Sequence, residues 1–190
     1  MVNKFENNVT IFYYSGTGNS LYVAKKILEN FQDARLVSIP TISDSIIECN
    51  SEKIGFVFPI NGKFLPPIVF NFMQNLNMTN PSYIFAIATY GMFLGKAMPI
   101  FNSIILNKGY KLDYGKKIKM PANCVISYPI RRNTINILKK AEEKIHKVCE
   151  DLKQQKKSVI RKNISLNEKH YLFVSAKRKK YLHLTITFNF

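Results

Sequence analysis

The chain has 190 residues, of which 46% are apolar and 21% charged, a composition ordinary for a soluble globular protein. Its net charge of +16 is unusual. This length suffices for one domain with a real core. No apolar run approaches the roughly 20 residues of a membrane span and the N-terminus has no hydrophobic signal region, so we expect a cytoplasmic protein.

The first apolar run predicts a strand over residues 9–14, followed by a helix from about residue 19 to 31 and a second strand over 34–39. The loop between this strand and helix is rich in hydroxyl, amide and glycine residues. Such a loop suits a phosphate, because backbone N–H groups at a helix start lack partners and the helix dipole is positive there. It has no lysine, which points away from nucleotide triphosphates. The candidate phosphate-binding residues are Ser15, Gly16, Thr17, Gly18, Asn19 and Ser20.

Two further apolar runs, residues 54–58 and 83–89, predict strands buried on both faces, with a helix over 65–76 between them. The loops after these strands combine glycines with apolar and aromatic side chains, which suits the rim of a flat aromatic ligand. The carboxyl ends of parallel strands share one edge of a sheet, where ligands bind. The candidate residues are Pro59, Ile60, Asn61, Gly62, Thr89, Tyr90, Gly91 and Gly95.

A phosphate at the first loop and a planar ring between the other two describe flavin mononucleotide (FMN). Two of these residues have competing interpretations. Tyr90 either stacks on the flavin or packs at the sheet edge. Gly62 either permits a peptide flip toward the flavin N5 or is an ordinary turn glycine.

The remaining elements are a helix over 98–106, a fifth strand suggested by the alternation in residues 110–114, and a helix from about 133 to 155. The last helix has an apolar stripe typical of core packing, formed by Leu138, Ala141, Ile145, Val148 and Leu152. We expect residues 1–155 to form the FMN-binding domain and residues 156–190 a basic C-terminal tail. Within the tail, residues 171–174 and 182–188 could each pair as strands.

Half of the net charge lies from Asp151 onward, where the sequence contains ten basic residues and only two acidic ones, Asp151 and Glu168. A basic tail could meet nucleic acid, an anionic membrane or an acidic redox partner, or it could be a solvated segment.

Residues 14–20, together with 58–59 and 88–91, resemble the flavodoxin-like domain of the iron–sulfur flavoproteins. The resemblance implies an α/β fold with a doubly wound parallel five-stranded sheet in the order 2-1-3-4-5. It also implies FMN, with the phosphate held by residues 15–20 and the isoalloxazine flanked by residues 59–62 and 89–95. In that family a two-cluster ferredoxin domain usually follows.

The chain departs from that family in its cysteines. Ferredoxin clusters need a run of closely spaced cysteines, whereas Cys49, Cys124 and Cys149 are scattered. We therefore expect a flavodoxin-like domain that stands alone, with no metal site. No Ser–His–acid, paired-carboxylate or zinc arrangement is defensible, so we assign no catalytic residue and leave the chemistry to the cofactor.

The predicted function is electron transfer through FMN, with a ferredoxin-type or other acidic redox protein as partner. The alternative is an FMN-dependent oxidoreductase that reduces a quinone or another small molecule. A third interpretation is a nonredox module whose tail binds nucleic acid, which we do not expect because the tail lacks a groove-reading element. Lys63 and Lys96, if near the ring, would favour the reduced flavin and raise its potential.

Overall fold

The computed structural model describes residues 2–42, 46–92, 94–122 and 133–158. Five parallel strands form its central sheet, in the order β3-β2-β5-β7-β8. Counted along the chain within this sheet, the order is 2-1-3-4-5, which confirms the prediction. The strands are β2 (Val9–Tyr13), β3 (Ala34–Ser38), β5 (Lys53–Pro59), β7 (Tyr83–Tyr90) and β8 (Tyr114–Lys119).

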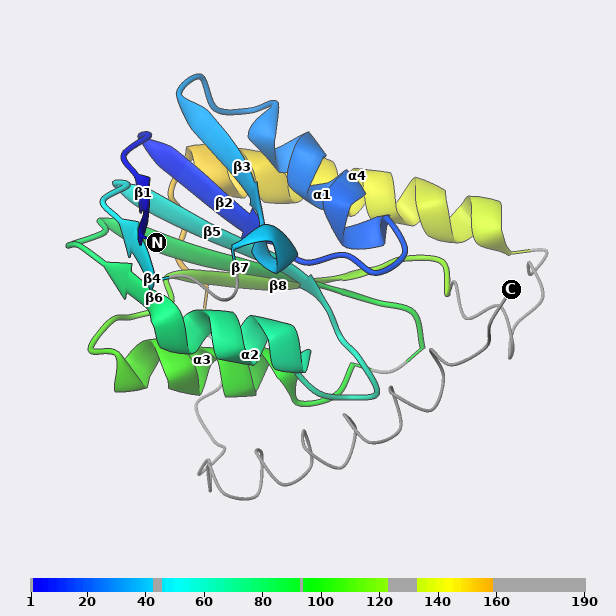
Figure 1. Cartoon of the computed structure of the whole chain (residues 1–190). Coiled ribbons are helices and arrows are strands. Elements are labelled where there is room, and N and C mark those ends of the chain that lie inside the picture. The colour runs from blue at the N-terminus through cyan, green and yellow to red at the C-terminus, as the bar shows by residue number, and fades with distance from the viewer. Residues whose placement is uncertain (1, 43–45, 93, 123–132, 159–190) are drawn as a thin grey trace, which may run out of the picture.

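Helices cover both faces of this sheet, α1 and α4 on one and α2 and α3 on the other (Figure 1). A single turn of 3-10 helix, η1 (Ile39–Thr41), follows β3. The predicted helices are all present, with ends shifted by one to three residues. They are α1 (Asn19–Leu28), α2 (Pro67–Asn75), α3 (Ala97–Asn107) and α4 (Thr134–Lys153).

The core consists of two apolar layers separated by the sheet. In β7, Phe85 and Ile87 pack toward α1 and α4, whereas the intervening Ala86 and Ala88 join the layer beneath α2 and α3. All four side chains have no solvent exposure. The continuous apolar run of this strand is therefore explained by burial on both faces.

A second sheet of three short parallel strands was not predicted. It consists of β1 (Val2–Phe5), β4 (Ile46–Cys49) and β6 (Leu76–Met78), in the order β1-β4-β6. Each of these strands precedes a main strand by only three or four residues, and their order repeats that of β2, β5 and β7. The small sheet thus extends the amino ends of the three central strands (Figure 1).

The predicted fifth strand, residues 110–114, is wrong in position, because the structure places β8 at Tyr114–Lys119. Leu112 is buried and Tyr110 donates a hydrogen bond to the Met78 carbonyl, so their alternation reflects a connection packed against the core. The true strand is rich in lysine because it lies at the edge of the sheet, where charged side chains protect unpaired backbone groups.

The stripe on α4 is confirmed for Ala141, Ile145, Val148 and Leu152, which are all buried. The prediction is wrong for Leu138, which is 39% exposed. The start of α4 continues past the carboxyl ends of the strands, so this first part of the stripe has less sheet to cover (Figure 1).

Residues 171–174 and 182–188 of the predicted tail lie outside the described residues, as does Cys124. Cys49 and Cys149 are buried free thiols. After α4 the chain returns to the sheet, where the Ser158 N–H donates to the Asp113 carbonyl at 2.9 Å. Within the part of the chain that the structure describes, no helix is long and apolar enough to span a membrane.

Candidate functional site

A cavity of about 490 Å³ opens at the carboxyl ends of β2, β5 and β7. The strand order reverses between β2 and β5, which is where open α/β sheets bind ligands. Twelve of the fourteen predicted binding residues line this cavity: Ser15, Gly16, Thr17, Asn19, Ser20, Pro59, Ile60, Asn61, Gly62, Thr89, Tyr90 and Gly91. Gly18 and Gly95 do not line it, and their positions indicate different roles.

Gly18 shapes the first loop. It is the N-cap residue of α1 and has a left-handed backbone with φ of 91°. Its N–H donates to the Ser15 Oγ at 3.1 Å, and its carbonyl accepts the first helical hydrogen bond from Tyr22. A Cβ added at Gly16 or Gly18 would meet no atom within 4 Å, so the loop borders open space. The amides of the first helical turn have no acceptor within α1 and remain available to a ligand.

Two side-chain hydrogen bonds fix this loop to the rest of the sheet edge. The buried hydroxyls of Ser20 and Thr89 lie 2.8 Å apart. The Asn19 Nδ2 donates to the Pro121 carbonyl at 2.9 Å. Because one hydroxyl of a Ser–Thr pair donates to the other, the second hydroxyl keeps a proton that it can donate to a ligand.

The second loop is a tight turn held against β7. The Ile60 N–H donates to the Thr89 carbonyl at 2.7 Å, and Asn61 and Phe64 exchange two backbone hydrogen bonds of 3.0 Å. Gly62 and Lys63, at the tip of the turn, have positive φ angles of 51° and 76°. This turn brings the Asn61 and Gly62 backbone to the cavity wall.

Gly95 holds the second and third loops together. It has a φ of 48°, and a Cβ added to it would lie 2.1 Å from the Lys63 carbonyl oxygen. That oxygen accepts a hydrogen bond of 2.6 Å from the Lys96 N–H. Gly95 is therefore a positioning residue, because only a residue without a side chain allows the two loops this close.

Met92 lies within the predicted range 89–95, whereas sequence reasoning missed three other lining residues, namely Tyr14, Pro121 and Ala122. The last two follow β8, so the misplaced strand concealed them. Their segment is fixed by the Met120 N–H, which donates to the Tyr90 carbonyl at 2.8 Å. A correct placement of β8 would have revealed them, since every main strand ends at this edge.

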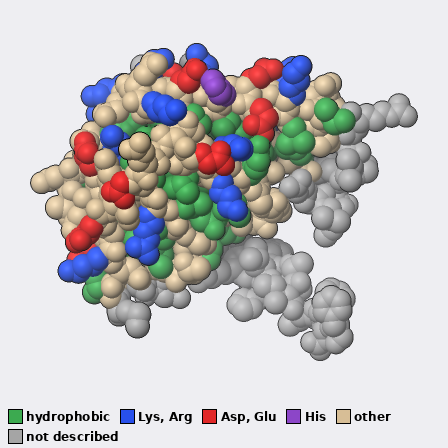
Figure 2. Space-filling model, turned by 90° about the horizontal axis from the view of Figure 1, so that it is seen from above, with side chains coloured by type: hydrophobic (Ala, Val, Ile, Leu, Met, Phe, Trp, Pro, Cys, Tyr) green, Lys and Arg blue, Asp and Glu red, His purple; other side chains and the backbone are tan. Residues whose placement is uncertain are grey.

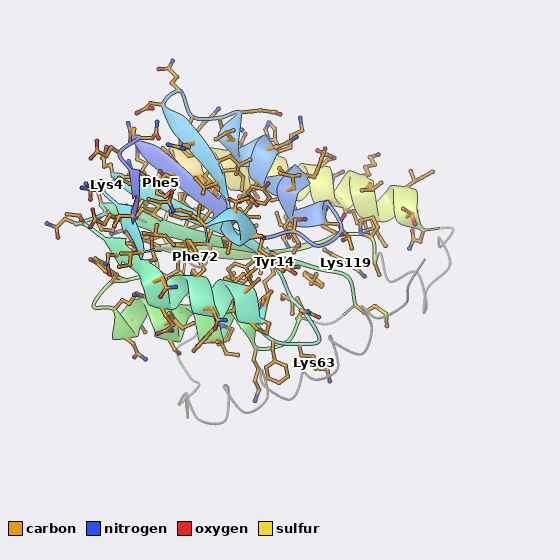
Figure 3. All side chains as sticks on the ribbon, in the orientation of Figure 1. Lys4, Phe5, Tyr14, Lys63, Phe72 and Lys119 are labelled. Carbon is orange, nitrogen blue, oxygen red and sulfur yellow. The ribbon has the colours of Figure 1, made fainter. Side chains whose placement is uncertain are left out.

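None of the described residues that line the cavity is charged. Lys63 and Lys119 lie at the same end of the sheet as Tyr14 but outside the lining (Figure 3). Met92, which lines the cavity, is 47% exposed, and Leu94, two residues further along the chain, is 49% exposed. Among the described residues, no group of three or more His, Cys, Asp or Glu side chains could hold a metal ion.

No protein-family model and no curated protein matches this sequence. Among solved structures, this chain is similar to an FMN-dependent NADH-azoreductase from Bacillus anthracis. The alignment spans 79% of this chain and 99% of the azoreductase, with 10% identity and a TM-score of 0.52. The Trp repressor binding protein of Bacillus subtilis covers 76% and 98%, with 14% identity and a TM-score of 0.48. Megasphaera elsdenii flavodoxin covers 72% and 98%, with 18% identity and a TM-score of 0.44. The observed sheet order is that of the flavodoxin-like doubly wound α/β fold, and the match to the azoreductase, at 10% identity, bears on the fold alone.

Proposed function

We propose that this protein binds FMN noncovalently in the cavity at the carboxyl edge of the sheet and transfers electrons. The observation that carries this proposal is the division of the cavity wall into two halves. One half is the polar loop of residues 15–20 at the start of α1, and the other is formed by the loops after β5 and β7. A ligand with a phosphate at one end and a flat ring at the other matches this division.

The residues of the first loop fit a phosphate monoester. Free amides at the start of α1 and the side chains of Ser15, Thr17 and Asn19 can supply hydrogen bonds. Among the described residues that line the cavity, none is acidic and would repel the anion. Since none of these lining residues is a lysine either, dipoles rather than full charges would hold a phosphate there.

The other two loops fit a flavin ring. Ile60, Tyr90 and Met92 supply apolar surface that excludes water from an aromatic ligand, and Tyr90 can stack on it. Asn61 and Gly62 line the same part of the cavity, where they can contact the edge of the ring. When bound, FMN supplies the redox chemistry, because a flavin takes up two electrons and releases them singly.

We further propose a domain division, a family relation and a class of redox partner. The FMN-binding domain comprises residues 1–155, and residues 156–190 form a basic tail. The chain is related to the flavin half of the iron–sulfur flavoproteins. Its redox partner is a ferredoxin-type or other acidic protein, in keeping with the net charge of +16.

An FMN-dependent oxidoreductase is the second candidate, favoured by the exposed apolar mouth. Met92 and Leu94 could cover a small hydrophobic acceptor placed against the ring. The Bacillus anthracis azoreductase shows that an FMN-dependent enzyme can use this fold. Steady reduction of a quinone by the FMN-loaded protein with NADH would favour this candidate over a carrier of electrons.

The experiment that tests FMN binding is a titration of the full chain with FMN, followed by visible absorption and quenching of flavin fluorescence. Gly18→Ala and Gly109→Ala form a matched pair, because both glycines have positive φ, 91° and 82°, and open space around them. Both variants therefore carry a similar backbone strain of about 1–2 kcal/mol. Only Gly18 shapes the proposed phosphate site.

We expect saturable binding of one FMN per chain and an affinity about tenfold lower in Gly18→Ala, the equivalent of about 1.4 kcal/mol. Gly109→Ala should bind FMN like the unmodified chain. A colourless protein that also fails to bind added FMN would overturn the proposal. Equal losses in both variants would contradict the assignment of the phosphate site.

A further inference from the structure

A second cavity, of about 600 Å³, lies between the edge strand β8 and the first half of α4. We call it the basic groove, and its wall is made of Lys119, Asn133, Asn136, Ile137, Lys139, Lys140, Ala141, Glu143 and Lys144. The wall thus contains four lysines and a single carboxylate. All four lysines are exposed.

The charge of the basic groove is not neutralised within the described part of the chain. None of the ion pairs recorded among those residues involves Lys119, Lys139, Lys140 or Lys144. By sequence, residues 123–132 contain no acid and residues 159–190 contain only Glu168. The groove therefore keeps a local excess of positive charge that an external anion can complement.

The basic groove adjoins the proposed FMN site through one short segment. Lys119, the last residue of β8, lines the groove, while Pro121 and Ala122 line the FMN cavity. The Met120 N–H between them donates to the Tyr90 carbonyl. Figure 3 shows Lys119 at the same end of the molecule as Tyr14. A partner seated on the groove would lie beside the mouth of the FMN cavity.

The charge excess distinguishes the basic groove from the neighbouring face. On the face covered by α1 and α4, basic and acidic side chains lie side by side (Figure 2). There, Lys26 forms an ion pair with Glu29 at the end of α1, and Glu142 accepts a hydrogen bond from Tyr22. That face offers an acidic partner little net attraction.

We propose that the basic groove docks an acidic electron-transfer protein through carboxylates on that protein's surface. This rests on the proposed function, because the groove matters for electron transfer only if FMN occupies the adjacent cavity. In the step, a reduced iron–sulfur cluster of the partner loses one electron and the oxidised flavin gains it. No bond between heavy atoms forms or breaks.

A protein fits the basic groove better than a nucleic acid does. None of the described residues in the wall is aromatic and could stack on a base, and Glu143 would repel a phosphate backbone. Ile137 and Ala141 add apolar surface, as expected of a protein interface with a charged rim.

The test uses the FMN-loaded full chain and, as probe, a small acidic two-cluster ferredoxin reduced with dithionite. Stopped-flow absorption measures the second-order rate of flavin reduction at low and high ionic strength. The test variant is Lys119→Glu with Lys140→Glu. The matched control is Lys111→Glu with Lys153→Glu, which reverses two exposed lysines, one in the connection before β8 and one at the C-terminal end of α4.

We expect the groove variant to react about tenfold more slowly at low salt, because reversing charges at a docking surface slows association. The difference should vanish near 0.5 M salt, where charges are screened over a few ångströms. The rate for the control should stay within about twofold of the rate for the unmodified chain, because exposed charges far from the docking surface have little effect on association.

Equal rates in the groove variant and the control, with FMN still bound to both, would overturn the docking proposal and leave the proposed function intact. If the chain binds no FMN, the proposed function fails instead. Fluorescence anisotropy of labelled oxidised ferredoxin with the FMN-free chain then still tests the groove, and unchanged affinity after charge reversal would overturn it. Salt-sensitive binding of a single-stranded oligonucleotide without ferredoxin binding, lost in the groove variant, would also overturn the choice of partner.

Discussion

The two ends of the main sheet use polar groups in opposite ways. At the amino end, four carboxylates accept hydrogen bonds from neighbouring residues: Asp33, Glu52, Asp113 and Asp151. At the carboxyl end, none of the side chains that the structure describes in the cavity wall is charged. The protein therefore satisfies its own backbone and charges at one end, whereas at the other it leaves loop amides and hydroxyls for a ligand.

At the amino end, a group of hydrogen bonds around the Asp151 carboxylate joins α4 to the sheet. Asp151, almost fully buried, accepts hydrogen bonds of 2.9 Å from the Tyr114 hydroxyl and from the Lys156 ammonium. The Tyr83 hydroxyl donates to the Lys156 carbonyl at 2.5 Å. The hydrogen bonds from Lys156 and Tyr114 lower the pKa of Asp151, whereas burial raises the pKa of both tyrosines above their usual range.

Asp151→Asn should give the largest effect and should separate stability from binding. Asp151 is buried but Lys156 is half exposed, so loss of the charged hydrogen bonds from Lys156 and Tyr114 is expected to lower the free energy of unfolding by about 2–3 kcal/mol at pH 7. FMN affinity should not change, since the residue lies at the opposite end of the sheet. Urea unfolding and FMN titration of the same samples measure both quantities.

The pH dependence of this effect has a defined sign. The pKa of Asp151 is lowered in the folded state, so its stabilising contribution is present above the unfolded pKa of about 3.9 and is lost as pH falls through the folded pKa. The unmodified chain should therefore lose its advantage over Asp151→Asn below about pH 4. A stability difference that is the same at pH 7 and pH 3 would contradict this account.

Gly95→Ala tests the carboxyl end, where the loops must approach closely. The new Cβ would collide with the Lys63 carbonyl, so the loops must separate. We expect FMN affinity to fall about 30-fold, the equivalent of about 2 kcal/mol. Gly109→Ala, at another positive φ but in open space, is the control. Equal FMN affinities in the two variants would show that the contact between these loops does not shape the site.

Ser20→Ala should have a smaller effect, because it leaves the buried Thr89 hydroxyl without its partner. The expected loss is about 1 kcal/mol in the free energy of unfolding, with a few-fold weaker FMN binding. Ser103→Ala is a suitable control, since its hydroxyl donates only to the Pro99 carbonyl within α3. If Ser103→Ala destabilises the protein as much, the hydroxyl pair at the site has no special importance.

The combined Lys63→Ala and Lys96→Ala variant should have the smallest effect. Both lysines are exposed, and neither lines the cavity, so water screens their charges from a bound flavin. Removing positive charge should lower both reduction midpoints by only about 20 mV, a third of the 59 mV that correspond to a tenfold change. Spectroelectrochemistry measures the shift, and unchanged or raised midpoints would exclude an electrostatic role for these side chains.

The sequence predicted well those features that depend on local patterns. The apolar runs of β5 and β7 and the loop at Gly18 carry their signals within ten residues of chain, and parallel pairing then brings the three loops to one edge. β8 was misplaced because an edge strand rich in lysine has no apolar run. The small sheet was missed because strands of three or four residues depend on long-range pairing. The contact of Gly95 with Lys63 likewise joins two distant loops.

The predicted role of residues 15–20 is tested most directly by comparing the affinities of the full chain for FMN and riboflavin, which differ only in the phosphate. If the amides at the start of α1 hold this group, FMN should bind at least about tenfold more tightly, the equivalent of about 1.4 kcal/mol. Gly18→Ala should reduce that difference, and Gly109→Ala should preserve it. Equal affinities for FMN and riboflavin would contradict the assignment of a phosphate site at the carboxyl end of the sheet.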